Sequence, residues 1–208
     1  MRVPPELATV QAAVSFDGPV AEPVFAAAAA ALSRVGDSIT ERHHAKRGPI
    51  TRYAIDQVRM GSHRPWNNEG QQLPLVHSAA VSINATFTDF DELARWVAWS
   101  AGIDGLSIGY IDWDLTDSQR RKVERSARQK AVRDAARRAQ DYADALGLGS
   151  VAPCAVNDPG LGGPPQRKVM MASAVAGPMG GTPDFTLQPE DVEVNADVEA
   201  TFAVRTAG

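Results

Sequence analysis

The sequence predicts an α+β fold, with a mainly antiparallel sheet of about six strands, two or three helices packed on one face of that sheet, and a long Gly/Pro-rich loop. Apolar and polar residues alternate over residues 8–16, 79–87 and 192–204, and a period of two is typical of strands that bury one face. Alanine recurs at every fourth position over residues 127–143, which is the spacing of one helix face. Glycine and proline gather over residues 157–184, which indicates a loop.

The first half of the chain is expected to contain a helix and a hairpin after its opening strand. Pro23 suits the first turn of a helix, because the N–H that it lacks is not needed there. Gly36 is a suitable end for that helix. Residues 38–44 and 50–60 are expected to form two strands of a hairpin. Residues 61–74, which are rich in Pro, Gly and Asn, are expected to form a loop.

The middle of the chain is expected to contain two helices separated by a strand. Asp89 followed by Glu92 is typical of a helix start, and Gly102 is suited to the end of that helix. Residues 106–115 are expected to form the strand, and residues 116–146 a long helix that Gly147 closes. The alanine stripe of this long helix predicts close packing against the sheet, because small side chains let two backbones approach each other.

We expect a single domain over residues 1–208, with a flexible loop at residues 157–184. Within this loop, residues 168–172 could form a short edge strand. So long an irregular insertion is uncommon inside a compact domain, which predicts that it is either mobile or held by a partner. The closing strand, residues 192–204, is long enough to be a central or a hairpin-spanning element.

Composition excludes several classes of protein. The 208 residues are 44% hydrophobic and 22% charged, which is ordinary for a soluble globular protein. The net charge of −4 argues against general attraction to nucleic acid or anionic lipid. A single cysteine, Cys154, excludes an internal disulfide framework and indicates a reducing compartment. No apolar run is long enough to span a membrane and no secretory signal opens the sequence, so we expect a cytoplasmic protein.

The residues that most often carry chemistry show no catalytic or ligand pattern. His43 and His44 would point to opposite faces of a strand, and the spacing of His63 and His77 does not match a metal site either. Cys154 has no neighbouring base in the sequence, which favours a buried or passive thiol over a nucleophile. The glycines of the loop lack the Gly-Lys-Ser/Thr ending of a phosphate-binding loop. We therefore expect no enzyme activity, no cofactor and no bound metal.

The long helix is basic. Residues 120–146 carry nine basic and four acidic side chains, a local balance of +5. Three pairs at i, i+4 spacing are expected to neutralise part of it, namely Glu124 with Arg128, Asp134 with Arg138, and Arg137 with Asp141. The acidic residues of the closing strand offer further counter-charge. The pattern favours a solvated or intersubunit salt-bridged face, and binding of nucleic acid is the less favoured interpretation.

The helix that begins near Asp89 predicts a subunit contact. If Phe90, Leu93 and Val97 form its buried face, then Trp99 lies almost opposite and Trp96 off-centre. Tryptophan and arginine are enriched at the centres of protein interfaces. The candidate oligomer interface is therefore Arg95, Trp96 and Trp99. Cover by the loop at residues 61–74, which contains Trp66, is the alternative explanation.

Two segments resemble a known family. Residues 126–151 form an alanine-striped helix that ends in Leu-Gly and a Gly-x-Val, and residues 189–202 read Pro-Glu-Asp-Val-Glu-Val-Asn-Ala-Asp-Val-Glu-Ala-Thr-Phe. Both resemble the SIMPL domain family (domain of unknown function 541), and the likeness covers nearly the whole chain. Glu190 stands where that family's closing motif usually has glycine. The resemblance implies an α+β protein, often oligomeric, related to bacterial stress-linked or immunogenic envelope proteins of the 26 kDa type and to kinase-associated animal proteins. It supplies no catalytic residues.

The favoured function is a non-enzymatic oligomeric assembly or interaction protein of the SIMPL type, which the resemblance connects with stress. A homo-oligomer is the expected partner arrangement. One alternative is a small-ligand-binding protein or enzyme with a pocket beneath the loop at residues 157–184. Another is a nucleic-acid-associated protein that uses the basic helix at residues 120–146.

Overall fold

The structure, a computed structural model, describes residues 1–66, 72–159 and 187–205, and the expected loop at residues 157–184 therefore lies almost entirely outside the described residues, including its expected edge strand at residues 168–172. The chain divides into two compact units. Among the described residues, the sheet unit comprises residues 5–66, 72–114 and 187–190, and the α3 unit comprises residues 1–4, 115–159 and 191–205. The expectation of a single domain stays a prediction.

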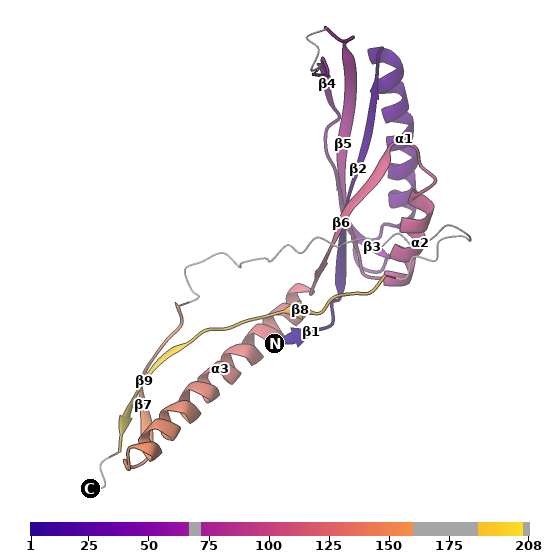
Figure 1. The fold of residues 1–208 in the computed structure, drawn as a ribbon. Coiled ribbons are helices and arrows are strands. Elements are labelled where there is room, and N and C mark those ends of the chain that lie inside the picture. Colours follow the sequence, from indigo (N-terminus) through magenta and orange to yellow (C-terminus); the bar gives the residue numbers. More distant parts are fainter. Residues whose placement is uncertain (67–71, 160–186, 206–208) are drawn as a thin grey trace, which may run out of the picture. The chain divides into compact units, whose positions relative to one another are not determined.

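The sheet unit is built on one antiparallel sheet, which confirms the α+β prediction. Its strands are β2 (Leu7–Gly18), β3 (Ile50–Ile55), β4 (Arg59–His63), β5 (Val76–Phe87) and β6 (Leu106–Asp114). Their order is β3-β5-β2-β6, and β4 also pairs with β5. The long strands β2 and β5 pair over nearly their whole length, from Ala8 opposite Phe87 to Gly18 opposite His77 (Figure 1).

Helices α1 (Ala21–Arg42) and α2 (Phe90–Ser100) cover one face of this sheet (Figure 1). The alternation that the sequence shows decides which face, because every second residue of β2 and β5 is buried against the helices. The fully buried residues that form this core are Ala8, Val10, Val14, Val35, Ile39, Ile50, Ile83, Ala85, Phe87, Leu93 and Trp96. The other face is polar, with Gln11 beside Asn84 and a contact of 3.1 Å between the hydroxyls of Thr9 and Thr86.

Helix α1 is longer than the sequence predicted. Gly36 lies inside the helix, and the expected strand at residues 38–44 is wrong, because the helix runs to Arg42. A mid-helix glycine costs about 1 kcal/mol. Burial of a side chain such as Ile39, which is fully buried, contributes about 1.5–3 kcal/mol and outweighs that cost. The second arm of the expected hairpin is in fact two short strands, β3 and β4.

The turn from α2 into β6 requires glycine. Asp89 begins α2 as expected, since its side chain accepts a hydrogen bond of 2.9 Å from the backbone N–H of Glu92. After the helix, Gly105 has φ +74°, in the left-handed region. A Cβ at this position would overlap the ring of Phe16. Glycine is therefore the residue that fits both the backbone and the space.

The α3 unit is a helix followed by a two-stranded ribbon. Helix α3 (Asp117–Ala145) is capped at its start by Thr116, whose hydroxyl accepts from the N–H of Gln119, and is followed by Gly147 with φ +67°. The N–H of Leu148 donates to Ala143 O at 2.8 Å, which completes a Schellman turn. Strand β7 (Val151–Asn157) then pairs antiparallel with β9 (Glu199–Val204), and β1 (Arg2–Val3) pairs with β8 (Val192–Glu193) (Figure 1).

One of the predictions about this unit needs correction. The closing strand is not continuous, because β8 and β9 pair with different partners and residues 194–198 lie between them. The alternation in this segment reflects alternating burial without a continuous strand, since Val194 is buried while its neighbours in the sequence are exposed. The alanine stripe is buried at its ends, Ala127 and Ala143, and half-buried between them. Helix α3 contacts the ribbon strands β7 and β9 of its own unit, so close packing against the main sheet stays a prediction.

Candidate functional site

A groove of about 540 Å³ lies between α1 and α2 in the sheet unit. Six side chains line it, five from α1 and one from α2, namely Arg34, Asp37, Ser38, Glu41, Arg42 and Trp99. Most of them lie three or four residues apart along α1, which is the spacing that places side chains on one helix face.

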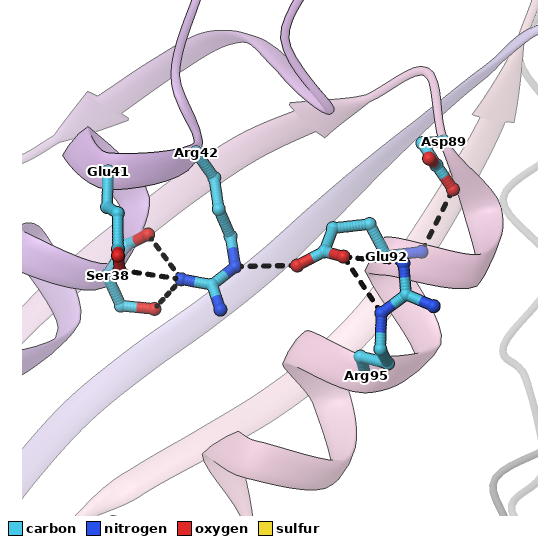
Figure 2. A network of polar contacts seen from close by, with 6 residues as sticks. All are labelled: Ser38, Glu41, Arg42, Asp89, Glu92 and Arg95. Carbon is cyan, nitrogen blue, oxygen red and sulfur yellow. Dashed lines mark hydrogen bonds and ion pairs between the residues drawn. The ribbon is translucent and has the colours of Figure 1, made fainter.

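A polar network joins the two helices beside this groove (Figure 2). Arg42, at the end of α1, donates from Nε to Glu92 Oε1 on α2 at 2.9 Å. Its Nη1 donates to the carbonyl and to the hydroxyl of Ser38, both at 3.0 Å. The other carboxylate oxygen of Glu92 accepts two hydrogen bonds from Arg95, at 2.6 and 2.8 Å. Glu92 is thus held by one arginine from each helix.

These contacts keep Glu92 ionised. The hydrogen bond from Arg95 is the main cause that lowers the pKa of the Glu92 carboxyl below its usual value of 4.5. Partial burial opposes this effect, and Arg42 adds to it through a hydrogen bond and its charge. The carboxylate is therefore available as an anionic link between α1 and α2 throughout the neutral range.

The structure places the three residues of the expected oligomer interface in different environments. Trp96 is 1% exposed, with its ring centroid 5.7 Å from that of Phe87, so its assignment to the surface is wrong. The buried residues of α2 are Leu93, Trp96 and Ser100, whereas the predicted buried face was Phe90, Leu93 and Val97. Trp99 is 36% exposed at the groove. Arg95 is exposed and paired with Glu92, as described above.

Trp99 packs on Trp96, with 6.2 Å between the ring centroids. The indole Nε1 of Trp96 is buried and has no hydrogen-bond partner among the described residues. Trp99 therefore rests on a side chain that the core fixes. A contact between subunits through Trp99 and Arg95 stays a prediction.

The α3 unit has a small core and an apolar surface. Its buried cluster consists of Leu115, Val123, Ala127 and Val194. Large apolar side chains are exposed on α3, on the turn after it and on the ribbon, namely Val132, Tyr142, Leu146, Leu148, Val156 and Val204. Tyr142 and Leu146 are 71% and 73% exposed. Several large apolar side chains of this unit thus face solvent in the single chain.

The charges of the α3 unit are only partly paired. Asp134 binds Arg138 as expected, Glu124 lies 4.0 Å from Arg128, and the hydrogen bond from Arg138 lowers the pKa of Asp134. The pairing of Arg137 with Asp141 is wrong, because Arg137 reaches Asp134 instead, at 2.5 Å.

The acidic side chains that follow in the closing segment, Asp191, Glu193, Asp197 and Glu199, are all exposed. None of them forms an ion pair with α3 in the part of the chain that the structure describes. The counter-charge that the sequence offers to the basic helix is therefore not used within this chain.

The remaining candidate residues lie apart from the groove. His43 ends α1 and packs its ring against Tyr53, 5.0 Å away, while the Nδ1 of His44 accepts from two backbone N–H groups in a turn. Cys154 is exposed on β7, so of the two expected alternatives the buried thiol is wrong and the passive thiol stays a prediction. Within residues 1–66, 72–159 and 187–205, no three His, Cys, Asp or Glu side chains gather as a metal would need. In the same residues, no helix is both long and apolar enough to cross a membrane.

Comparison with known families gives a match over residues 1–202, to the model described as SIMPL, protein of unknown function (DUF541). The chain belongs to the SIMPL family. The match spans both units of this SIMPL protein and confirms the resemblance of the α3 helix and the closing segment. No curated protein matches the chain. The description of the family names no activity that could be carried over to this SIMPL protein.

Proposed function

We propose that this SIMPL protein is a non-enzymatic assembly protein that associates with copies of itself through the α3 unit. The observation that supports the proposal most is that few residues of α3 are buried while several large apolar side chains on and beside it are exposed. Three of the 29 residues of α3, which is described throughout, are buried, while the side chains of Tyr142 on α3 and of Leu146 and Leu148 just after it are exposed.

A partner would stabilise the α3 unit, whose helix and two-stranded ribbon bury little apolar surface. A two-stranded ribbon such as β7 with β9 is marginally stable by itself in water. A helix that is polar on most of its surface needs ion pairs or a neighbour, because its own propensity contributes little. Self-association would bury Tyr142, Leu146 and Leu148, and each side chain fully removed from water contributes about 1.5–3 kcal/mol.

The distribution of charge favours a second copy as the partner. Three basic side chains exposed on α3 form no ion pair with any described residue, namely Arg125, Lys130 and Arg133. The acidic side chains of residues 191–199 likewise form no ion pair with a described residue. One surface that carries both signs is complementary to itself, as the symmetric interface of a homo-oligomer requires.

Sedimentation velocity of the full chain tests this proposal. We expect an oligomer in low salt that Arg125→Glu with Arg133→Glu weakens, and that Glu193→Lys with Asp197→Lys also weakens. A mixture of the two double variants restores assembly, because each then meets the opposite charge. Arg52→Glu with Arg59→Glu, on β3 and β4 of the sheet unit, is the matched control and leaves assembly unchanged. A wild-type chain that sediments as a monomer at all concentrations would refute the proposal.

The stress-related role and the cytoplasmic location belong to the proposal as well and are supported by the resemblance and by composition alone. The two alternatives predict other outcomes. If the protein associates with nucleic acid, DNA or RNA should retain it through the exposed arginine and lysine side chains of α3, and this retention should fall steeply with salt. A ligand-binding protein or enzyme would use a pocket beneath the loop at residues 157–184, of which residues 160–184 lie outside the described part.

A further inference from the structure

The groove between α1 and α2 presents both signs of charge from one rigid helix. Arg34, Ser38 and Arg42 follow each other at four-residue spacing on α1 and therefore share a face. Asp37 and Glu41, also four residues apart, line the same groove. Two cations and two carboxylates thus stand side by side around a hollow of about 540 Å³.

The cationic part of the groove is prepared for an oxyanion. Arg42 is fixed by the hydrogen bonds of its Nε and Nη1, and Figure 2 shows its third nitrogen, Nη2, pointing away from these contacts. Neither that nitrogen nor the exposed Arg34 has a partner among the described residues. A guanidinium held in this way has lost its conformational freedom already and presents free N–H donors to carboxylate or phosphate oxygens.

The same groove also carries groups that suit an organic cation. Trp99 offers a half-exposed indole whose position is fixed by the buried Trp96. The face of an indole attracts alkylammonium groups, and neighbouring carboxylates strengthen that attraction. Asp37 makes no ion pair with a described residue, and Glu41 reaches Arg42 only at 3.5 Å. Both carboxylates are exposed and available to a positive charge.

We propose that this groove binds a small zwitterion in which an oxyanion group is joined to an alkylammonium group. The oxyanion is bound by Arg34 and Arg42, and the ammonium group lies on Trp99 beside Asp37 and Glu41. An inorganic anion or a simple organic cation satisfies only half of these groups and meets repulsion from the other half. The ligand class therefore follows from the pairing of charges, and it is independent of self-association by the α3 unit.

Isothermal titration with phosphocholine tests the proposal on the full chain. We expect saturable binding, with inorganic phosphate and choline each weaker by roughly tenfold or more, because each lacks one set of contacts. Trp99→Leu and Arg34→Glu abolish the heat of binding, and Trp99→Phe retains part of it. Trp66→Leu and Arg52→Glu are the matched controls, since they remove an exposed indole and reverse an exposed charge outside the groove.

Vesicles of phosphatidylcholine distinguish the two sources of such a ligand. Cosedimentation that free phosphocholine competes away identifies a lipid headgroup, and binding of phosphocholine without vesicle binding identifies a free metabolite. Either outcome supports the proposal. No heat with phosphocholine at millimolar concentration, or equal losses in the groove variants and in the matched controls, overturns it. Circular dichroism of each variant verifies that the fold is intact.

Discussion

Truncation of Trp96 to alanine measures how firmly α2 is held on the sheet. The side chain is 1% exposed between Phe87 and Trp99, so its removal loses the transfer energy and leaves a cavity, which typically costs about 3–5 kcal/mol. The buried indole N–H has no partner, and an unsatisfied buried donor costs about 1–3 kcal/mol in the native state. Removal of that donor offsets part of the loss, so we expect Trp96→Ala to lose about 3 kcal/mol.

Urea unfolding followed by far-ultraviolet circular dichroism gives the comparison, with the denaturant slope as a check that the unfolded state is unchanged. Trp96→Phe keeps most of the ring and removes the unpaired donor, and we expect it to lie within about 1.5 kcal/mol of the wild type. Trp99→Ala, at a half-exposed position, loses less than about half as much as Trp96→Ala. A loss below about 1 kcal/mol for Trp96→Ala, or equal losses for the alanine and phenylalanine variants, would refute this reasoning.

Three further predictions concern a turn, a helix cap and a carboxylate. Gly105→Ala forces a left-handed backbone and an overlap with Phe16, so thermal unfolding should show a loss of at least about 2 kcal/mol, whereas Gly147→Ala, with nothing within 4 Å, loses only about 1–2 kcal/mol. Asp89→Ala removes the cap of α2 and costs about 1 kcal/mol by the same measurement, while Asp89→Asn keeps most of it. The folded-state pKa of Glu92 lies below its unfolded value, so its ion pairs stabilise the protein fully above pH 4.5, and this stability is lost as the pH falls through the folded pKa. The difference in unfolding free energy between wild type and Glu92→Gln should therefore shrink on acidification, and a difference that is constant down to pH 3 would contradict this account.

The elements with a clean period were predictable from sequence, and those decided by long-range packing were not. The faces of β2 and β5 follow from alternation, because a strand with one buried face has no other way to sort its side chains. The end of α1 does not follow from Gly36, because the local cost of glycine is smaller than the burial of Ile39 on the sheet. A local stop signal such as Gly36 therefore does not predict the end of a helix when buried contacts continue beyond it.

The candidate site shows the same limit. The sequence predicted correctly that Trp99 is exposed. Which residues of α2 are buried depends on the side chains of the sheet beneath the helix, and Trp96 packs on one of these, Phe87. Arg42 and Glu92 lie 50 residues apart, so no local spacing indicates their contact. Strand β7 was missed because Pro153 lacks a ladder donor, and the structure accommodates it with an irregular register beside Ala155.

The order β3-β5-β2-β6 has two interior strands, β5 and β2, and β2 is the first strand of this sheet to leave the ribosome. About 60 residues separate the end of β2 from the start of β5, and at roughly 5–20 residues per second the nascent chain waits several seconds for that neighbour. During this interval α1 is the element at hand to shield the apolar side of β2, through packing such as that of Val24 against Phe16 and Ala79 in the finished protein. The length of α1, which continues past Gly36, thus also allows it to cover β2 until β5 is made, when an unpaired apolar strand is prone to aggregate.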